Sequence, residues 1–273
     1  MPDLTIDTER THAILTGFLR AEFQRAGFER AVVGVSGGVD SALSCFLAAG
    51  ALGAQNVLAV RMPYRTSSPA SLEHAQMVIE AAGVQSLTIE ITPMVEPLFS
   101  RFPEMNSLRR GNIMSRQRMI ILYDQSSATN ALVVGTGNKT EILLGYTTLF
   151  GDSACALNPL GDLYKTQALQ LARAMGIPEI IVANPPSADL WEGQTDEGEL
   201  GFSYARVDRL LYLLVDEGCT PAACVSAGFE QAFVHLVMDR VRRSQFKRSL
   251  PPIARLSERT TAYDFTPPSS WGG

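Results

Sequence analysis

The sequence has few of the residues that bind transition metals or form disulfide frameworks. Only four cysteines and three histidines occur among its 273 residues. No two cysteines have Cys-x-x-Cys spacing, and the histidines lie far apart in the chain. These spacings argue against a structural zinc site and fit a protein of a reducing compartment.

Long hydrophobic runs and an excess of positive charge are also absent. No apolar stretch approaches the roughly 18 residues that a membrane-spanning helix needs. The formal net charge of −5 argues against a nucleic-acid binder. The N-terminus, MPDLTIDTER, lacks the basic and then apolar order of a secretory signal, so we expect a cytoplasmic location. With 46% apolar residues, the chain can form a substantial core.

Runs rich in valine, isoleucine and leucine alternate with segments of helical periodicity. The strand-like runs cover residues 31–35, 56–62, 86–91 and 131–136. Helices are predicted over about residues 7–26, 39–51, 70–82, 107–128, 138–145, 163–175, 204–216 and 229–243. This alternation predicts an α/β fold, a doubly wound parallel sheet flanked by helices, with ligands at the carboxyl ends of the strands.

We expect one domain over residues 1–255, and two segments with special roles. Residues 184–203 are rich in proline, glycine and acidic side chains, and we interpret them as a mobile lid. The tail over residues 256–273 is expected to be partly disordered.

The most informative segment is a glycine-containing turn between a predicted strand and a predicted helix. The sequence Ser36-Gly37-Gly38-Val39-Asp40-Ser41 follows the apolar run 31–35. Glycines bring backbone N–H groups close to an anion, and the start of the next helix favours negative charge. We interpret the turn as a phosphate-binding loop, with pyrophosphate as the favoured anion. A glycine-rich turn without a ligand is the alternative.

The charged residue of this loop is an aspartate. No Gly-Lys-Ser/Thr follows at the spacing of P-loop NTPases, and Asp40 takes the charged place. A carboxylate beside bound phosphates requires a cation between them, which predicts Mg²⁺ as a cofactor.

A second glycine segment, residues 134–141, leaves the fourth predicted strand. It does not match the dinucleotide fingerprint, because Thr140 stands where the third glycine would fall. The segment offers the Thr136 hydroxyl and the Glu141 carboxylate. Glu141 is either a second Mg²⁺ ligand facing Asp40 or a charge in the first turn of a helix.

Several basic residues lie on predicted helices. Asn112 and Arg116 share one helix face and Arg118 points elsewhere, so the two arginines cannot both contact one ligand from a straight helix. Lys165 near a helix start is explained by a bound phosphate. Surface exposure is the alternative for each of these residues.

A basic cluster lies near the C-terminus. Because Phe246 is its single aromatic neighbour, we interpret the cluster as a solvated or phosphate-binding face and not as a nucleic-acid site. Its members are Arg240, Arg242, Arg243, Lys247 and Arg248.

Together these motifs resemble the NAD synthetase family of the N-type ATP pyrophosphatases. The resemblance spans nearly the whole chain, through residues 36–41, 112–118, 135–141, 151–152, 163–167, 186–190, 196–201 and 246–248. It implies amidation of nicotinic acid adenine dinucleotide (deamido-NAD) by ammonia, with ATP as co-substrate, an acyl-adenylate intermediate, and release of AMP and pyrophosphate. The alternatives are another pyrophosphatase of this type that amidates or thiolates a different substrate, and a non-catalytic adenine-nucleotide-binding protein.

The resemblance also implies roles for individual residues. It implies Asp40 and Lys165 as catalytic residues, Asp40 and Glu141 as Mg²⁺ ligands, and contacts to deamido-NAD from Arg116 and Lys247. It implies ATP contacts from Gly34, Val35, Ser36, Gly37, Gly38, Val39, Asp40, Ser41, Arg61, Thr136, Lys165 and Ser187.

Two positions depart from the family pattern. Leu149 stands where many members have a lysine that contacts the dinucleotide, and Ala156 where they have an aspartate. Either neighbouring groups such as Tyr146 or Asp152 recognise the nicotinate end, or the substrate sits differently.

The resemblance further implies a homodimer in which the helix carrying Arg116 pairs with its copy across a two-fold axis. Glutamine-using members carry an additional amidohydrolase domain, whereas the first loop of this chain begins at Ser36. Free ammonia is therefore the expected direct nitrogen donor, and a separate glutaminase could supply it in the cell.

Overall fold

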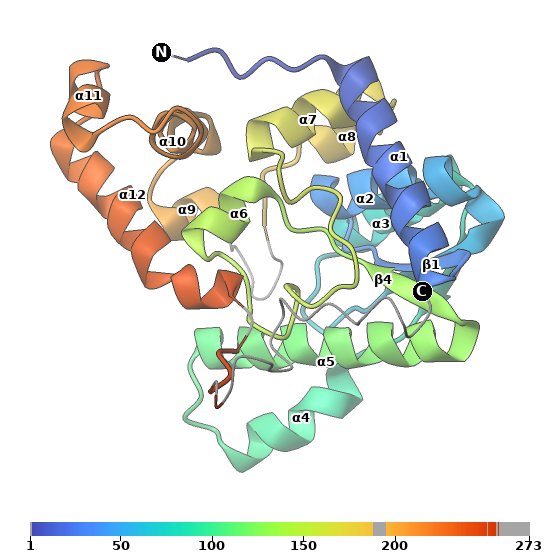
Figure 1. The fold of residues 1–273 in the computed structure, drawn as a ribbon. Helices are drawn as coiled ribbons and strands as arrows, with labels where there is room; N and C mark the ends of the chain where they lie inside the picture. The colour runs from blue at the N-terminus through green and yellow to red at the C-terminus, as the bar shows by residue number, and fades with distance from the viewer. Residues whose placement is uncertain (1, 188–194, 250, 255, 257–273) are drawn as a thin grey trace.

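A computed structural model describes residues 2–187, 195–249, 251–254 and 256 of the chain (Figure 1). Its centre is a parallel sheet of four strands in the order β3-β2-β1-β4. The strands are β1 (Arg30–Gly34), β2 (Val57–Arg61), β3 (Gln85–Thr88) and β4 (Ala131–Val134). The predicted α/β fold with a parallel sheet is confirmed. Residues 188–194 of the predicted lid and 257–273 of the predicted tail lie outside the described residues.

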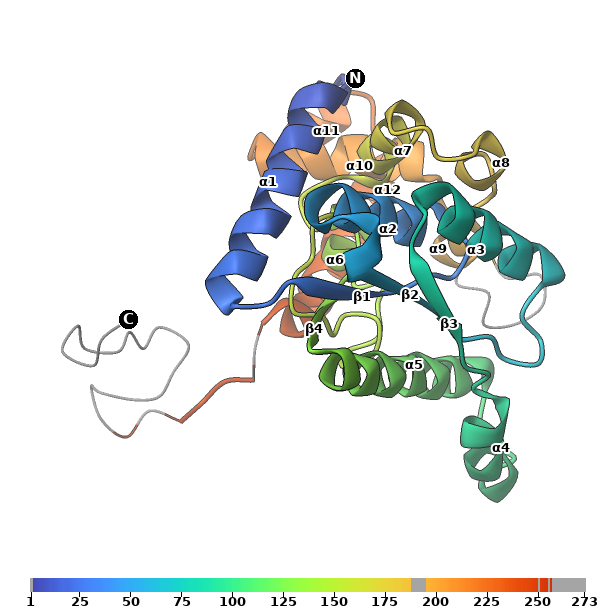
Figure 2. The ribbon, with the colours of Figure 1, turned by 90° about the vertical axis from the view of Figure 1, so that its right-hand side faces the viewer.

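Helices cover both faces of the sheet (Figure 2). On one face lie α1 (Thr8–Ala26), α2 (Val39–Leu52), α3 (Pro69–Ala82), α7 (Lys165–Ala174) and α8 (Glu179–Val182). On the other lie α4 (Thr92–Arg101) and α5 (Ser107–Thr129). Successive side chains of a strand point to opposite faces, so Val33 belongs to the core on the first side and Val32 to the core on the second.

The remaining helices pack beside the sheet around a third apolar cluster. They are α6 (Lys139–Leu144), α9 (Asp196–Leu200), α10 (Tyr204–Leu211), a π-helical turn (Tyr212–Asp216), α11 (Pro221–Ser226), α12 (Gln231–Arg243) and a 3₁₀ turn (Gln245–Arg248). Aromatic side chains fill this cluster, including Tyr164, Tyr204 and Phe233. Leu144 of α6 and Tyr164 at the start of α7 belong to this cluster, so its packing holds both helices in place beside the sheet.

Some element boundaries differ from those predicted. All four predicted strands end early, β1 and β2 by one residue, β3 by three at Thr88 and β4 by two at Val134. After β4 the chain turns toward a separate loop, where Gly135 N donates to Leu157 O over 2.7 Å. The helices α4, α8, α9 and α11 are absent from the prediction, because they are short and, in α4, interrupted by Pro97. The predicted helix 204–216 is α10 continued by the π-helical turn.

The structure bears on the expectations about membrane-spanning helices and about the cysteines. Among the described residues, no helix is both long and apolar enough to cross a membrane. All four cysteines are free thiols. Burial raises the pKa of the Cys45 thiol to about 12, so this cysteine is an unreactive part of the core.

Candidate active site

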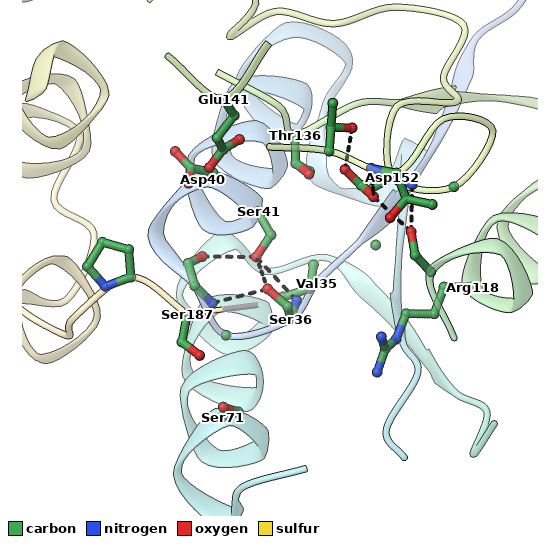
Figure 3. A pocket seen from close by; sticks show the side chains of 18 of the residues that line it. Val35, Ser36, Asp40, Ser41, Ser71, Arg118, Thr136, Glu141, Asp152 and Ser187 are labelled. Atoms are coloured by element: carbon green, nitrogen blue, oxygen red, sulfur yellow. Dashed lines mark hydrogen bonds between the residues drawn. The ribbon is translucent and has the colours of Figure 1, made fainter. Parts of the chain in front are cut away.

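A cavity of about 780 Å³ opens where β1, β2 and β4 end (Figure 3). The loop after β1, the end of β2, the loop after β4, the starts of α6 and α7, and one side of α5 line it. Every residue for which the sequence predicts catalysis, metal binding, or contact with ATP or deamido-NAD lines this cavity, except Arg116. The carboxyl ends of the strands therefore bring together side chains from six separate segments, as expected for this type of sheet.

The loop after β1 is closed by its own hydrogen bonds. Ser41 Oγ accepts from Ser36 N over 3.2 Å and donates to Gly38 O over 2.9 Å. Gly37 has φ +91°, and a Cβ there would lie 2.3 Å from Ser71 O at the start of α3. Only glycine fits this position, because both the conformation and the close backbone contact exclude a side chain. The loop is thus held as a tight turn at the start of α2, suited to an anion.

Asp40, Glu141 and Lys165 form one buried cluster beside this loop. The Lys165 ammonium makes an ion pair with Asp40, and its Nζ lies 3.9 Å from Glu141 Oε1. Asn138 Nδ2 lies 3.4 Å from Asp40 Oδ1. The Lys165 side chain is only 3% exposed. Three residues far apart in sequence therefore meet at the phosphate loop.

The structure confirms Glu141 as a charge in the first turn of a helix, and its second carboxylate oxygen is left facing the cavity, where metal binding stays a prediction. Asn138 begins α6 with a capping box: Glu141 N donates to Asn138 Oδ1 over 3.0 Å, and Asn138 N donates to Glu141 Oε2 over 3.2 Å. This exchange satisfies two backbone groups at the helix start. Oε1 faces Lys165, and the carboxyl group lies beside Asp40 in the cavity (Figure 3). The cap orients the carboxylate toward the cavity.

The electrostatics of the cluster favour an added cation. Burial and the nearby Asp40 charge raise the pKa of Glu141 well above its ordinary value. Burial alone would lower the pKa of Lys165, but the Asp40 and Glu141 charges outweigh it and raise that pKa, so the ammonium stays charged. One cation thus faces two carboxylates, and a second cation would relieve their repulsion.

These carboxylates fit Mg²⁺. Among the described residues, no group of three or more His, Cys, Asp or Glu side chains could hold a metal by itself. Mg²⁺ is commonly bound by one or two carboxylates, with waters and substrate phosphates as its other ligands. Asp40 and the Oε1 atom of Glu141, beside a phosphate-type loop, supply that donor set.

A third carboxylate, that of Asp196, lies near Lys165. Asp196, at the start of α9, accepts from Tyr204 Oη over 3.0 Å and from Tyr146 Oη over 3.2 Å, and burial raises its pKa. The Tyr204 ring centroid is 5.4 Å from Lys165 Nζ. Sequence patterns did not identify Tyr204, because a tyrosine at a helix start has no distinctive spacing. Tyr146, expected near the nicotinate end, contacts α9 through Asp196 and also lines the cavity.

Asp152 holds the loop over residues 147–153 against α5. Its carboxylate accepts from Ser115 Oγ over 2.8 Å, from Thr147 Oγ1 over 2.6 Å and from Thr148 N over 2.9 Å. Thr148 Oγ1 donates to Asn112 Oδ1 over 2.8 Å. With three donors already on its two oxygens, Asp152 shapes the cavity wall.

Arg116 and Arg118 of α5 diverge, as expected, but of these two Arg118 is the one at the cavity (Figure 3). Its Nε donates to Met62 O over 3.0 Å at the end of β2. Arg116 Nε donates to Leu149 O over 3.2 Å, and Arg116 is not among the residues that line the cavity. The sequence missed Arg118 because periodicity alone does not show which helix face meets a ligand.

The basic cluster near the C-terminus is tied largely to backbone carbonyls. Lys247 Nζ donates to Gly145 O over 2.8 Å and to Thr147 O over 2.6 Å, and burial lowers its pKa. Arg248 donates to Leu143 O over 2.8 Å, and Arg240 donates to Leu200 O over 3.1 Å. The interpretation as one solvated or phosphate-binding face is therefore corrected for Arg240 and Arg248, whereas Lys247 lines the cavity and its contact with substrate stays a prediction.

Two further predicted ATP contacts lie on opposite sides of the loop. Arg61 Nη1 donates to Gln76 Oε1 over 2.7 Å, while its Nε is buried without a hydrogen-bond partner. Thr136 lies at the end of β4 (Figure 3). A buried unsatisfied donor is unfavourable, so a ligand acceptor near Arg61 would stabilise the site.

Comparison with known proteins gives matches along almost the entire chain. Residues 12–251 match the NAD synthase family. An NH₃-dependent NAD⁺ synthetase from Trichlorobacter lovleyi is 53% identical over 272 residues, with 100% of both chains covered.

Two solved structures share the fold. One is an NMN synthetase from Francisella tularensis, with a TM-score of 0.81, 30% identity, and coverage of 92% of this chain and 99% of that chain. The other is an NH₃-dependent NAD synthetase from Campylobacter jejuni in complex with nitrate, with a TM-score of 0.79, 29% identity, and coverage of 92% and 100%.

Proposed function

The chain belongs to the NAD synthase family, and on this premise we propose how its residues carry out the ATP-using, ammonia-dependent synthesis of NAD. The enzyme is a ligase that forms a C–N bond. The acid substrate is deamido-NAD. The observation that carries the assignment of roles is the buried cluster of Asp40, Glu141 and Lys165 at the phosphate-type loop.

The reaction proceeds in two displacement steps. First, a carboxylate oxygen of the nicotinate attacks the α-phosphorus of ATP, and the bond from that phosphorus to the bridging oxygen breaks, which releases pyrophosphate. Next, the ammonia nitrogen attacks the carbonyl carbon of the acyl-adenylate. The bond to AMP breaks, and the nitrogen loses a proton to leave the amide.

The loop at residues 36–41 holds the β and γ phosphates. Its backbone N–H groups and the start of α2 favour an anion without any side-chain charge. Arg61 Nε and the Thr136 hydroxyl contact ATP from either side of the loop, and Ser187 contacts it from the segment after α8. The positive φ of Gly37, which glycine adopts without strain, lets the backbone of the loop come close to these phosphates.

Lys165 provides the mobile positive charge of the site. The Asp40 and Glu141 charges raise the pKa of Lys165, so the ammonium is protonated, and when ATP enters it leaves Asp40 and binds a phosphate oxygen. It then stabilises the charge that grows on pyrophosphate as the bond breaks.

Asp40 and Glu141 are the residues that would hold Mg²⁺ when ATP is bound. The ion supplies positive charge that offsets the charge on the departing pyrophosphate. Once Lys165 has left Asp40, the two carboxylates lie beside each other with no other cation at the cluster, so metal and ATP are expected to bind together.

Deamido-NAD occupies the part of the cavity bounded by α5 and Lys247. Arg118 and Asn112 line this part of the cavity, and Leu149 offers only its backbone carbonyl to Arg116. Arg116 lies outside the cavity of its own chain, so we assign it to the substrate bound near the boundary with a second copy.

A homodimer through α4 and α5 is consistent with the exposed apolar side chains there. On α5, Leu108 is 67% exposed and Ile120 is 54% exposed, and Met94 and Leu98 on α4 and Phe102 just after it are exposed as well. Exposed apolar side chains on adjoining helices are typical of a surface that pairs with another chain.

We also propose that the enzyme has a cytoplasmic location.

The test is to measure products with ATP and ammonia supplied. We expect AMP, pyrophosphate and NAD in equal amounts and no ADP. Nicotinic acid mononucleotide serves as a competing acid, because a protein of this fold is an NMN synthetase. Faster turnover of the mononucleotide than of deamido-NAD would overturn the assigned substrate, and ADP as product would overturn the assigned chemistry.

A further inference from the structure

Asp208 is a fully buried carboxylate of α10 that lies outside the cavity lining. It is 0% exposed and sits within the apolar cluster of the C-terminal helices. Burial raises its pKa, which shows that the surroundings disfavour the charge. A carboxylate in such a place is unfavourable unless hydrogen bonds compensate it. The hydrogen-bond donors to Asp208 therefore indicate its role.

Both partners of Asp208 stand next to residues of the proposed catalytic cluster. Thr140 Oγ1 donates to Asp208 Oδ1 over 2.6 Å, and Thr166 N donates to Asp208 Oδ2 over 2.8 Å. Thr140 precedes Glu141 and Thr166 follows Lys165. One carboxylate thus joins the first turn of α6 to the first turn of α7.

The link continues through Thr140 to the backbone of the lysine itself. Lys165 N donates to Thr140 Oγ1 over 3.0 Å. The residue at the start of α7, Tyr164, makes no side-chain cap, and its hydroxyl donates to Asp216. The first two amides of α7, those of Lys165 and Thr166, therefore donate to side chains of α6 and α10, whereas a serine or aspartate at the helix start usually accepts such bonds.

This arrangement fixes the relative position of the two helix starts that carry the catalytic side chains. The distance of 3.9 Å between Lys165 Nζ and Glu141 Oε1 depends on how α6 and α7 sit against each other. In the described part of the chain, the hydrogen bonds of Thr140 and Asp208 connect these first turns directly. A small displacement of a charged group from its productive position can lower turnover strongly.

We propose that Asp208 is a positioning residue, which acts through Thr140 and the first amides of α7 to hold Glu141 and Lys165 against the cavity. The proposal rests on the catalytic roles assigned to those two residues above. Asp208 touches neither substrate nor metal. It sets the geometry in which the charge growing on pyrophosphate is stabilised.

The test uses two nearly isosteric variants, Asp208→Asn and Thr140→Val. Asp208→Asn replaces one carboxylate oxygen, an acceptor, by an NH₂ donor that faces the Thr140 hydroxyl or the Thr166 amide. Thr140→Val removes the hydroxyl that donates to Asp208. We expect kcat to fall between about 10-fold and 100-fold in each, with KM for ATP and for deamido-NAD changed by less than about 3-fold, because the lost interaction acts in the transition state.

Two controls separate positioning from plain stability. Thr140→Ser keeps the hydroxyl and should recover most of the lost kcat. Thr16→Val makes the same change at a buried threonine of α1 whose hydroxyl donates to His12 O within its own helix over 2.8 Å. This variant should lose stability on thermal unfolding without loss of kcat.

The double variant Asp208→Asn with Thr140→Val completes the experiment. If Asp208 and Thr140 act through their shared hydrogen bond, the kcat of the double variant should be only slightly lower than that of the less active single variant. Should Thr140→Val, measured in folded protein, keep kcat within about twofold of the unchanged enzyme while Glu141→Gln abolishes turnover, the positioning role is overturned and the catalytic assignment stands. Normal turnover in Glu141→Gln would instead overturn the catalytic assignment.

Discussion

The Lys165 ammonium forms an ion pair with the Asp40 carboxylate, although the two residues lie 125 positions apart in the sequence. One side chain belongs to the start of α2 and the other to the start of α7. Each helix begins at the same end of the sheet, so the pair forms where an anionic ligand would bind. The pair supplies Asp40 with a counter-charge, which metal and nucleotide would replace in the proposed mechanism.

Removal of the lysine should affect both stability and turnover. Lys165→Met leaves two buried carboxylates without their cation, for which a loss on the order of 3 kcal/mol in the free energy of unfolding is typical. We expect kcat to fall about 100-fold or more, because the group acts on the leaving pyrophosphate. Chemical denaturation and steady-state kinetics would measure both.

A double variant tests the expected loss in the free energy of unfolding. When Asp40→Asn is added to Lys165→Met, the combined loss of stability should be smaller than the sum of the two single losses, since each substitution breaks the same ion pair. Simple additivity would mean that the pair contributes little to folding.

The raised pKa of Glu141 predicts a pH dependence of stability. A carboxyl whose pKa is higher in the folded than in the unfolded protein holds more protons when folded, so its contribution to stability falls as pH rises above its ordinary value of 4.5. Glu141→Gln removes this contribution. The melting temperature of the variant relative to the unchanged protein should therefore increase with pH.

Thermal unfolding at several pH values between about 5 and 8 would test this. Asp196 and Asp208 also have raised pKa values and remain in both proteins, so only the difference between the two curves reports on Glu141. Parallel curves would show that Glu141 is not perturbed in the folded protein.

A single methyl group at Gly37 should disrupt the phosphate loop. In Gly37→Ala the new Cβ would meet Ser71 O at 2.3 Å, in a backbone conformation with φ +91° that disfavours alanine. We expect a loss of about 1–3 kcal/mol in stability and weaker ATP binding. Calorimetric titration with ATP and thermal unfolding would measure the two effects.

The matched control is Gly17→Ala within α1. A Cβ there has no atom within 4 Å, and alanine favours helix more than glycine does by about 0.5–1 kcal/mol. This variant should be slightly more stable and bind ATP normally. ATP binding that stays unchanged in Gly37→Ala as well would separate the loop from nucleotide recognition.

Arg116 tests the shared site at the proposed dimer boundary. Because Arg116 does not line the cavity of its own chain, Arg116→Ala should weaken deamido-NAD binding more than ATP binding only if the substrate reaches a second copy. Sedimentation at micromolar concentration should show a dimer. A fully active monomer would contradict the shared site.

Much of the fold and the site follows from local sequence patterns. The apolar run before Ser36, the two glycines and Asp40 predict a strand, a tight turn and a helix in the order that the structure shows. The carboxyl-end rule for parallel strands then places Thr136 and Glu141 near Asp40. These predictions succeed because each depends on a few neighbouring residues and on one general property of the sheet.

Other features depend on contacts between distant segments. Arg116 and Arg118 are the same residue type on the same helix, so the sequence does not distinguish them. Only the packing of α5 against the sheet decides that Arg118 lines the cavity. Asp208 has an ordinary place in an amphipathic helix, and its role becomes visible only through Thr140 and Thr166. Short helices such as α8 lack enough residues for a periodic signal.

The most direct test of the catalytic centre is acid-dependent release of AMP by Asp40→Asn and Glu141→Gln. Both substitutions are close to isosteric, so the variants should fold, which thermal unfolding would verify. We expect turnover to fall about 100-fold or more in each, with AMP and pyrophosphate as the products of what activity remains. Near-normal turnover in both folded variants would contradict the claim that these two carboxylates hold the catalytic metal.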